Sequence, residues 1–175
     1  MMKKYVITGG PSSGKSTLLR ALEKKGFAVI EESAKEVIFL EKQRGVNEPW
    51  LEETFVDFQT KIVELQLKKE AEIPSDTDIV FIDRGVPDVL AYFKHRKFEP
   101  SQKLLECVKN RKYEKVFLLE QLPVHKKADY RVEDEQEAKR ISQLIKQSYQ
   151  SLGYDLISVP PLGVRKRVEF VLKNM

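Results

Sequence analysis

The sequence predicts an α/β fold with three layers, α/β/α, around a mostly parallel sheet of about five strands. Short apolar runs alternate with amphipathic helical segments along the chain, as they do in α/β proteins. Two of the runs, at 79–82 and 116–119, are apolar throughout, which is typical of buried parallel strands. A glycine-rich stretch joins the first run directly to a helical segment. At 175 residues, we expect a single domain spanning 1–175.

The individual elements follow from hydrophobic periodicity and from residues that begin or end helices. We expect strands at 5–8, 27–30, 79–82, 116–119 and 156–159. We expect helices at 15–25, 33–45, 88–95, 101–110, 133–152 and 164–173, and a long one at 48–72. Ser33 is a plausible N-cap, and Pro49 fits the first turn of the long helix. The segment 121–130 lacks periodicity and contains Pro123, so we expect a loop there.

Composition excludes several classes of function. No apolar run approaches the roughly 18 residues of a membrane span, so no membrane partner is expected. The single cysteine, Cys107, excludes an intramolecular disulfide and a cysteine metal cluster, which favours a cytoplasmic location. The net charge of +4 suits a phosphorylated ligand, and without a basic block no nucleic-acid partner is expected. The oligomeric state is left open.

The glycine-rich stretch matches the phosphate-binding pattern G-x-x-x-x-G-K-[ST] in full. Glycines let backbone N–H groups approach phosphate closely, and the following helix adds the partial positive charge of its N-terminus. Lys15 is expected to reach the outer phosphates, and the Ser16 hydroxyl to complete a Mg²⁺ shell. The expected nucleotide-binding residues are Gly9, Gly10, Ser12, Ser13, Gly14, Lys15, Ser16 and Thr17.

Carboxylates follow two of the predicted strands, at the sheet edge where α/β proteins bind ligands. Asp83 is a candidate to hold Mg²⁺ through water or to accept a proton from an attacking hydroxyl, and Arg84 to contact phosphate or substrate. The alternative is a solvated turn that caps the next helix. Glu32 is a candidate catalytic residue, preferred over Glu31 because alternation along the strand lets only one face the site. Alternatively, both are acids favoured by a helix N-terminus.

Other candidates lie farther along the chain. Arg131 is a candidate to neutralise charge during phosphoryl transfer, within a lid-like segment at about 121–140, although a loop arginine is more often solvated. Trp50, Phe55 and Gln59 are candidates to line an acceptor pocket, with the phenylalanines alternatively belonging to the core. The two histidines, His95 and His125, have no partner at metal-ligand spacing and are interpreted as surface residues.

Five segments together resemble the small bacterial AAA-type P-loop ATPases, which are grouped near ribosylnicotinamide kinases and other nucleoside or nucleotide kinases. They are YVITGGPSSGKST (5–17), VIEESAKEVI (29–38), FIDRGVPDVLAY (81–92), DYR (129–131) and VPPLGVRKR (159–167). The resemblance implies a nucleotide-kinase-like P-loop fold, ATP with Mg²⁺, and the roles given above to Lys15, Ser16, Asp83 and Arg131. It also implies that DYR belongs to the lid and that the last segment packs on the adenine.

Three hypotheses for function follow. The leading one is an ATP-dependent phosphotransferase that acts on a small hydroxyl- or phosphate-bearing metabolite, such as a nucleoside-like one. The second is an ATPase that uses water as acceptor and acts as a nucleotide-dependent switch; the guanine-binding pattern Asn-Lys-x-Asp is absent from the sequence. The third is a nonenzymatic nucleotide-binding module. The identity of the acceptor is left open, as is the choice of Glu32 or Asp83 as general base.

Overall fold

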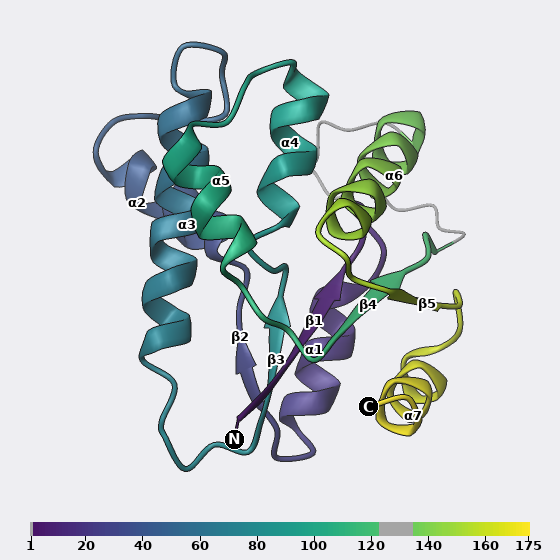
Figure 1. Cartoon of the computed structure of the whole chain (residues 1–175). Coiled ribbons are helices and arrows are strands. Elements are labelled where there is room, and N and C mark those ends of the chain that lie inside the picture. Colours follow the sequence, from purple (N-terminus) through teal and green to yellow (C-terminus); the bar gives the residue numbers. More distant parts are fainter. Residues whose placement is uncertain (1, 123–134) are drawn as a thin grey trace.

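The computed structural model describes residues 2–122 and 135–175 and contains a five-stranded sheet (Figure 1). The strand order is β2-β3-β1-β4-β5, and every pair is parallel. The strands are β1 (Lys3–Thr8), β2 (Ala28–Ile30), β3 (Ile79–Asp83), β4 (Lys115–Leu119) and β5 (Leu156–Val159). All five expected strands are therefore present, and the predicted class of fold is confirmed.

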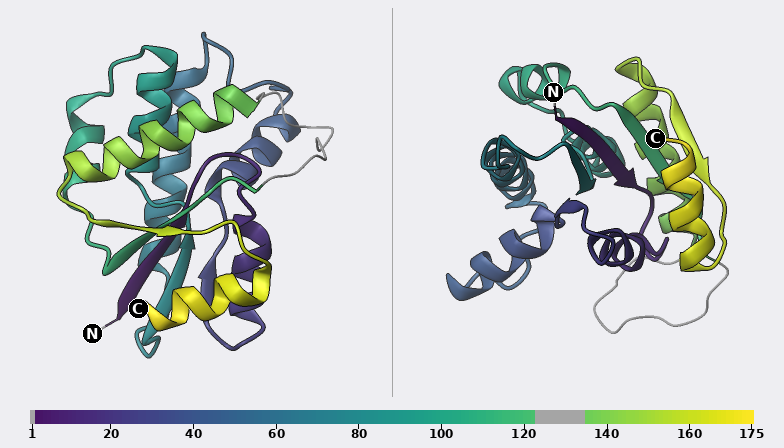
Figure 2. Two further views of the ribbon diagram at one scale, coloured as in Figure 1. Left: turned by 90° about the vertical axis from the view of Figure 1, so that its right-hand side faces the viewer. Right: turned by 90° about the horizontal axis from the view of Figure 1, so that it is seen from below.

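Helices cover both faces of this sheet (Figure 2). They are α1 (Lys15–Glu23), α2 (Ser33–Gln43), α3 (Phe55–Ala71), α4 (Asp88–Arg96), α5 (Gln102–Lys109), α6 (Glu135–Ser151) and α7 (Val164–Lys173). One buried cluster joins α1 and α7 to the sheet, and another joins α4 and α6 to it. A third cluster packs α3 and α5 against α4. Because the first two clusters lie on opposite faces of the sheet, the fold has three layers, with helices on both sides of the sheet.

Strand β1 shows how the sequence divides its side chains between the layers. Tyr5 and Ile7 pack in the cluster of α1 and α7, whereas Val6 packs in the cluster of α4 and α6. All three are at most 1% exposed. Alternate side chains of a strand point to opposite faces, so a central strand covered on both faces is apolar at consecutive positions.

The strand order places a topological switch point at the carboxyl ends of β1 and β3. The connection after β1 runs to β2 on one side, whereas the connection after β3 crosses β1 to reach β4 on the other side, so the connections that leave these two neighbouring strands diverge. Open α/β sheets bind ligands outside the carboxyl ends of their strands at such a point. The glycine-rich loop follows β1, and Glu32 and Asp83 lie at the ends of β2 and β3, so all three meet at this edge.

Two local expectations are wrong. The long helix was expected from 48, but α3 begins at Phe55, because a turn held by the Thr54 hydroxyl, which donates to the carbonyl of Pro49 at 2.8 Å, precedes it. Ser33 is the first residue of α2 and not its N-cap. Its hydroxyl donates to Gln66 Oε1 on α3 at 2.8 Å and so joins two helices.

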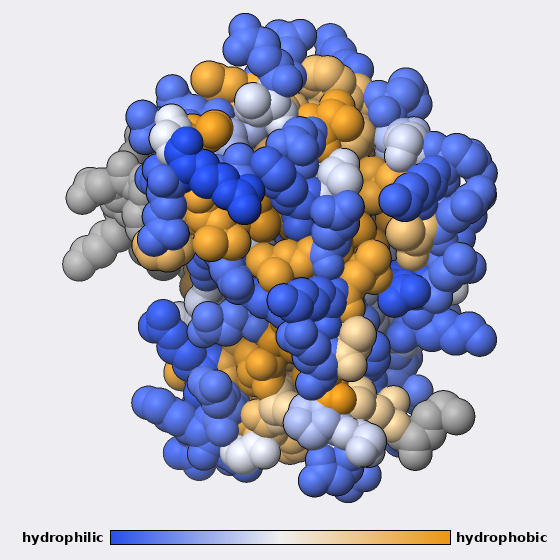
Figure 3. Space-filling view, turned by 90° about the vertical axis from the view of Figure 1, so that its left-hand side faces the viewer, coloured by the Kyte–Doolittle hydropathy of each residue, from blue (hydrophilic) through white to orange (hydrophobic). Residues whose placement is uncertain are grey.

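The side of the molecule formed by α2 and α3 shows apolar surface between charged side chains (Figure 3). Phe39 and Leu40 on α2, Leu51 before α3 and Val56 on α3 are all at least 40% exposed. Among the described residues, no helix has the length and apolar character needed to cross a membrane.

Candidate nucleotide and acceptor site

The phosphate-binding pattern forms a tight loop between β1 and α1. Gly14 is the N-cap of α1 and has a φ of 88°, a left-handed conformation that glycine adopts without strain. A Cβ there would lie 3.0 Å from a side-chain carbon of Leu122 and 3.1 Å from Arg167 Nη1. At Gly9 a Cβ would lie 2.7 Å from the carbonyl oxygen of Leu119. Both positions thus require glycine for backbone shape and for space.

Lys15 is folded into this loop. Its Nζ donates to the carbonyl oxygens of Gly9 at 3.1 Å and Gly10 at 3.0 Å, and lies 3.4 Å from Ser13 Oγ. The residue is 7% exposed. Burial, and then the nearby Arg84 charge, lower the pKa of Lys15 to about 7. The loop therefore holds an ammonium group whose charged form a phosphate would stabilise.

Glu32 and Arg84 meet at the strand ends, although they are far apart in the sequence. Arg84 Nε donates to Glu32 Oε1 at 2.9 Å, and Arg84 Nη1 donates to Asp88 Oδ1 at 3.1 Å. The side chain of Arg84 is 12% exposed and that of Glu32 is 18% exposed, whereas Glu31 is exposed. Of these two neighbouring acids, Glu32 is the one that reaches Arg84.

The two strand-end carboxylates have opposite pKa shifts. Burial raises the pKa of Glu32, but the charges of Arg84, Lys15 and Lys35 outweigh burial and lower the pKa to about 2. Burial and the neighbouring Glu32 charge raise the pKa of Asp83 to about 6. Pairs of acids whose environments separate their pKa values often have different roles in one site. Glu32 is thus the more acidic carboxyl of this pair, and Asp83 the less acidic one.

Asp88 is a buried residue of this site that the sequence analysis did not single out. It is 4% exposed and accepts hydrogen bonds from the Thr8 hydroxyl, Arg84, the Gly85 N–H and the Tyr149 hydroxyl. The available signal was its place at the start of the predicted helix 88–95, four residues after Arg84, although the pair forms across the turn before α4 and not along a helix. Asp88 fixes the direction of the Arg84 guanidinium.

The structure also tests whether the predicted residues fit Mg²⁺. The Lys35 ammonium lies 3.2 Å from Ser16 Oγ and 3.4 Å from Glu32 Oε2, so a positive charge already stands beside the expected hydroxyl ligand. Asp83 Oδ1 is buried without a hydrogen-bond partner among the described residues. These residues also include no cluster of three or more acidic, histidine or cysteine side chains suited to a metal. The arrangement fits a cation held mainly by phosphate and water oxygens.

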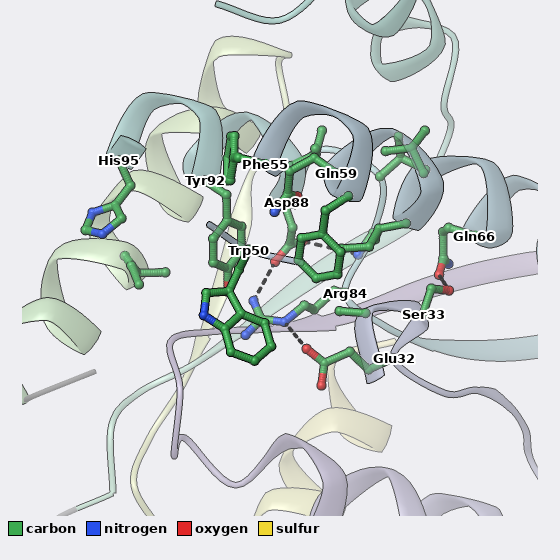
Figure 4. A pocket seen from close by; sticks show the side chains of 18 of the residues that line it. Glu32, Ser33, Trp50, Phe55, Gln59, Gln66, Arg84, Asp88, Tyr92 and His95 are labelled. Atoms are coloured by element: carbon green, nitrogen blue, oxygen red, sulfur yellow. Dashed lines mark hydrogen bonds and ion pairs between the residues drawn. The ribbon is translucent and has the colours of Figure 1, made fainter. Parts of the chain in front are cut away.

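Beside the carboxylates lies a pocket of about 330 Å³, walled by α2, α3, α4 and α6 (Figure 4). Trp50, Phe55 and Gln59 line it as expected. Phe55 is 2% exposed, so it belongs both to the core and to the pocket wall. Gln59 is 5% exposed and forms no side-chain hydrogen bond within the described part of the chain. Residues with ionisable side chains also line the pocket: Glu32, Asp83, Arg84, Asp88, His95, Arg96 and Glu137.

The remaining sequence predictions concern the two histidines, Arg131 and the lid-like segment. His95 was interpreted as a surface residue, and this is wrong: its side chain is 15% exposed, lines the pocket, and its Nε2 lies 2.8 Å from Glu137 Oε1 on α6. The sequence alone does not indicate this pair, because His95 and Glu137 lie far apart in the chain. Arg131, His125 and most of the lid-like segment lie outside the described residues.

Comparisons with known proteins agree with this architecture. Residues 4–167 match a family described as an AAA domain. Deoxyadenosine kinase from M. mycoides has a TM-score of 0.71 and 17% identity over 98% of this chain and 97% of the kinase. NadR, solved in complex with NR, has a TM-score of 0.72 and 17% identity; the match covers 98% of this chain and 49% of NadR, so this chain spans about half its length.

Thymidylate kinase from Candida albicans is more distant, with a TM-score of 0.66 and 14% identity over 99% of this chain and 90% of the kinase. Among curated proteins, no match is found. The structural similarities show a common P-loop kinase-like fold, and the family match covers almost the whole chain. The chain therefore belongs to this AAA-domain family, a family with the P-loop kinase-like fold.

Proposed function

We propose that this protein transfers the γ-phosphoryl group of ATP to a hydroxyl of a small, unphosphorylated, nucleoside-like acceptor. The observation that carries the proposal is the pocket, which is lined by the strand-end carboxylates Glu32 and Asp83. An ATPase needs room for one water molecule, whereas this cavity of about 330 Å³ has the size of a small-molecule site. The kinase-like fold of the relatives supports the same reaction.

The walls of the pocket suit a planar ring. Trp50 and Tyr92 present aromatic side chains to the cavity, and the side chain of Arg84 lies in the same cavity (Figure 4). The Gln59 amide, which has no hydrogen bond to another described residue, can donate and accept hydrogen bonds at once. An apolar slot with one such amide recognises a heterocycle by shape and by its polar edge.

The charges of the pocket favour an acceptor without phosphate. Arg84 is already paired with two carboxylates, and Arg96 donates to the carbonyl of Trp50 at 2.7 Å. The four acidic residues that line the pocket outnumber the two arginines: Glu32, Asp83, Asp88 and Glu137 against Arg84 and Arg96. The excess of carboxylates would repel a phosphate group on the acceptor, whereas it would not repel a neutral or cationic ring.

In the proposed reaction, the phosphate loop and Lys15 hold the triphosphate, and Glu32 orients the acceptor hydroxyl. The hydroxyl oxygen forms a bond to the γ-phosphorus, the bond from this phosphorus to the β,γ-bridging oxygen breaks, ADP leaves, and the hydroxyl proton passes to the Glu32 carboxylate. Ser16 and Asp83 would hold Mg²⁺, which neutralises phosphate charge when it is bound. A weak base suffices because positioning and electrostatics dominate phosphoryl transfer.

The test measures ADP release from ATP and Mg²⁺, alone and with a panel of nucleosides and their monophosphates. We expect stimulation by particular nucleosides and none by the matching monophosphates. A basal rate that no acceptor changes would instead indicate the ATPase. Trp50 is the single tryptophan of the chain, so its fluorescence reports acceptor binding separately from turnover. Nucleoside-dependent quenching, lost in Trp50→Phe, is expected.

A further inference from the structure

Arg167 on α7 is a buried cation that lies against the phosphate loop. It is 2% exposed and forms no ion pair within the described ranges 2–122 and 135–175. Its three guanidinium nitrogens each donate to a backbone carbonyl: Nε to Pro160 at 2.8 Å, Nη2 to Glu120 at 2.8 Å, and Nη1 to Ser13. One side chain thus joins the ends of β4 and β5 to the loop before α1.

The contact with Ser13 fixes the direction of a peptide group. In a planar trans peptide, the C=O of one residue and the N–H of the next point in opposite directions. Because Arg167 holds the carbonyl oxygen of Ser13, the N–H of Gly14 points away from the guanidinium. Among the described residues, this N–H donates no hydrogen bond, as befits a helix N-terminus that has orphan donors.

The close packing of Arg167 against Gly14 also indicates that this peptide group is held in place. A Cβ on Gly14 would lie 3.1 Å from Arg167 Nη1, so the guanidinium lies tightly against the turn that gives Gly14 its φ of 88°. A charged donor in a buried place forms stronger hydrogen bonds than a neutral one. The planar fork of an arginine can meet three carbonyls at fixed angles, which a lysine cannot do.

We propose that Arg167 is a positioning residue that preorganises the phosphate loop, so that the Gly14 N–H faces the outer phosphates before the nucleotide arrives. The proposal rests on the nucleotide binding of the proposed function. Preorganised donors bind an anion without a reorganisation cost. Removing the guanidinium should therefore weaken specifically the part of the affinity that the phosphates beyond the first provide.

The test compares the dissociation constants of ADP and AMP, with Mg²⁺, by calorimetry. For Arg167→Met we expect ADP affinity to fall at least roughly tenfold, the range of one charge-assisted hydrogen bond, while AMP affinity changes less than about threefold. Arg167→Lys, which keeps the charge but loses the fork, should give an intermediate loss. Arg165→Gln is the matched control, because Arg165 lies on the same helix with a side chain that is 92% exposed.

Several outcomes would overturn the inference. Equal losses for ADP and AMP would assign Arg167 to the adenine side, and unchanged ADP affinity in a folded Arg167→Met would remove the role altogether. If neither substituted protein folds, Arg167 belongs to the core and not to binding. Failure of the wild type to bind ADP would instead contradict the proposed function, so the two failures are distinguishable.

Discussion

Arg84 and Glu32 form an ion pair of 2.9 Å between Nε and Oε1 that joins the ends of two neighbouring strands. Arg84 adopts a φ of 66°, a left-handed conformation that costs a non-glycine residue about 1 kcal/mol or more. Its contacts with Glu32 and Asp88 offset this cost. The strained turn after β3 thus aims a guanidinium at a carboxylate that lines the pocket.

Glu32→Gln keeps the shape of this side chain and removes its charge and its capacity to accept a proton. We expect kcat to fall by about 10²- to 10⁴-fold, the range of general-base effects, with ADP affinity within about threefold of wild type because Lys15 and the loop are intact. Steady-state ADP release and calorimetry measure the two effects. Glu36→Gln, an exposed position on α2 that pairs with Lys69, is the control. Full activity in Glu32→Gln would remove Glu32 from catalysis.

Asp83→Asn should stabilise the nucleotide-free protein while it impairs turnover. Because the pKa of Asp83 rises from 3.8 to about 6 on folding, the native state binds more protons than the unfolded state between these values, and stability falls as pH rises through them. We expect the variant to exceed wild type by about 1 to 3 kcal/mol at pH 7.5, and the gain to vanish below pH 4. Urea unfolding at several pH values measures this. A gain in stability that does not depend on pH would show that it does not come from removing the charge of ionised Asp83.

Nucleotide affinity should decrease as pH rises above neutrality. The pKa of Lys15 is lowered to about 7 by burial, and a bound phosphate raises it again, so the complex holds more protons than the separate molecules. We expect the dissociation constant of ADP, at saturating Mg²⁺, to rise about tenfold per pH unit between about pH 7.5 and 9. Calorimetry in two buffers of different ionisation enthalpy should show proton uptake. Lys15→Met should lose both effects; an unchanged slope in it would point to another group.

Asp88→Asn should destabilise the fold strongly. The buried Asp88 carboxylate accepts from the Tyr149 hydroxyl at 2.7 Å and from Arg84 at 3.1 Å, and removing one partner of a buried ion pair typically costs about 3 to 5 kcal/mol. Thermal and urea unfolding measure the loss. Asp57→Asn is the control, because Asp57 is 65% exposed in its pair with Lys61, so a loss below about 1 kcal/mol is expected. Equal effects at both positions would contradict the structural role of Asp88.

Local signals in the sequence were sufficient for the elements and for the phosphate loop. The five apolar runs predicted the strands, because strands buried on both faces must be apolar at successive positions. The pattern from Gly9 to Ser16 predicted a loop, because its chemistry depends on the backbone of consecutive residues. The start of α3 at Phe55 was missed, because the turn before it is held by hydrogen bonds that periodicity does not reveal.

The sequence by itself determined the alternation of strands and helices, the phosphate loop, and the carboxylates that follow β2 and β3. Only the tertiary structure decided that Arg84 pairs with Glu32 and Asp88, that His95 meets Glu137, and that Arg167 holds the carbonyl of Ser13, 154 positions away. The physical reason is the range of each interaction. Backbone conformation and burial pattern depend on near neighbours in the chain, whereas these pairs form because strand order and helix packing bring distant segments together.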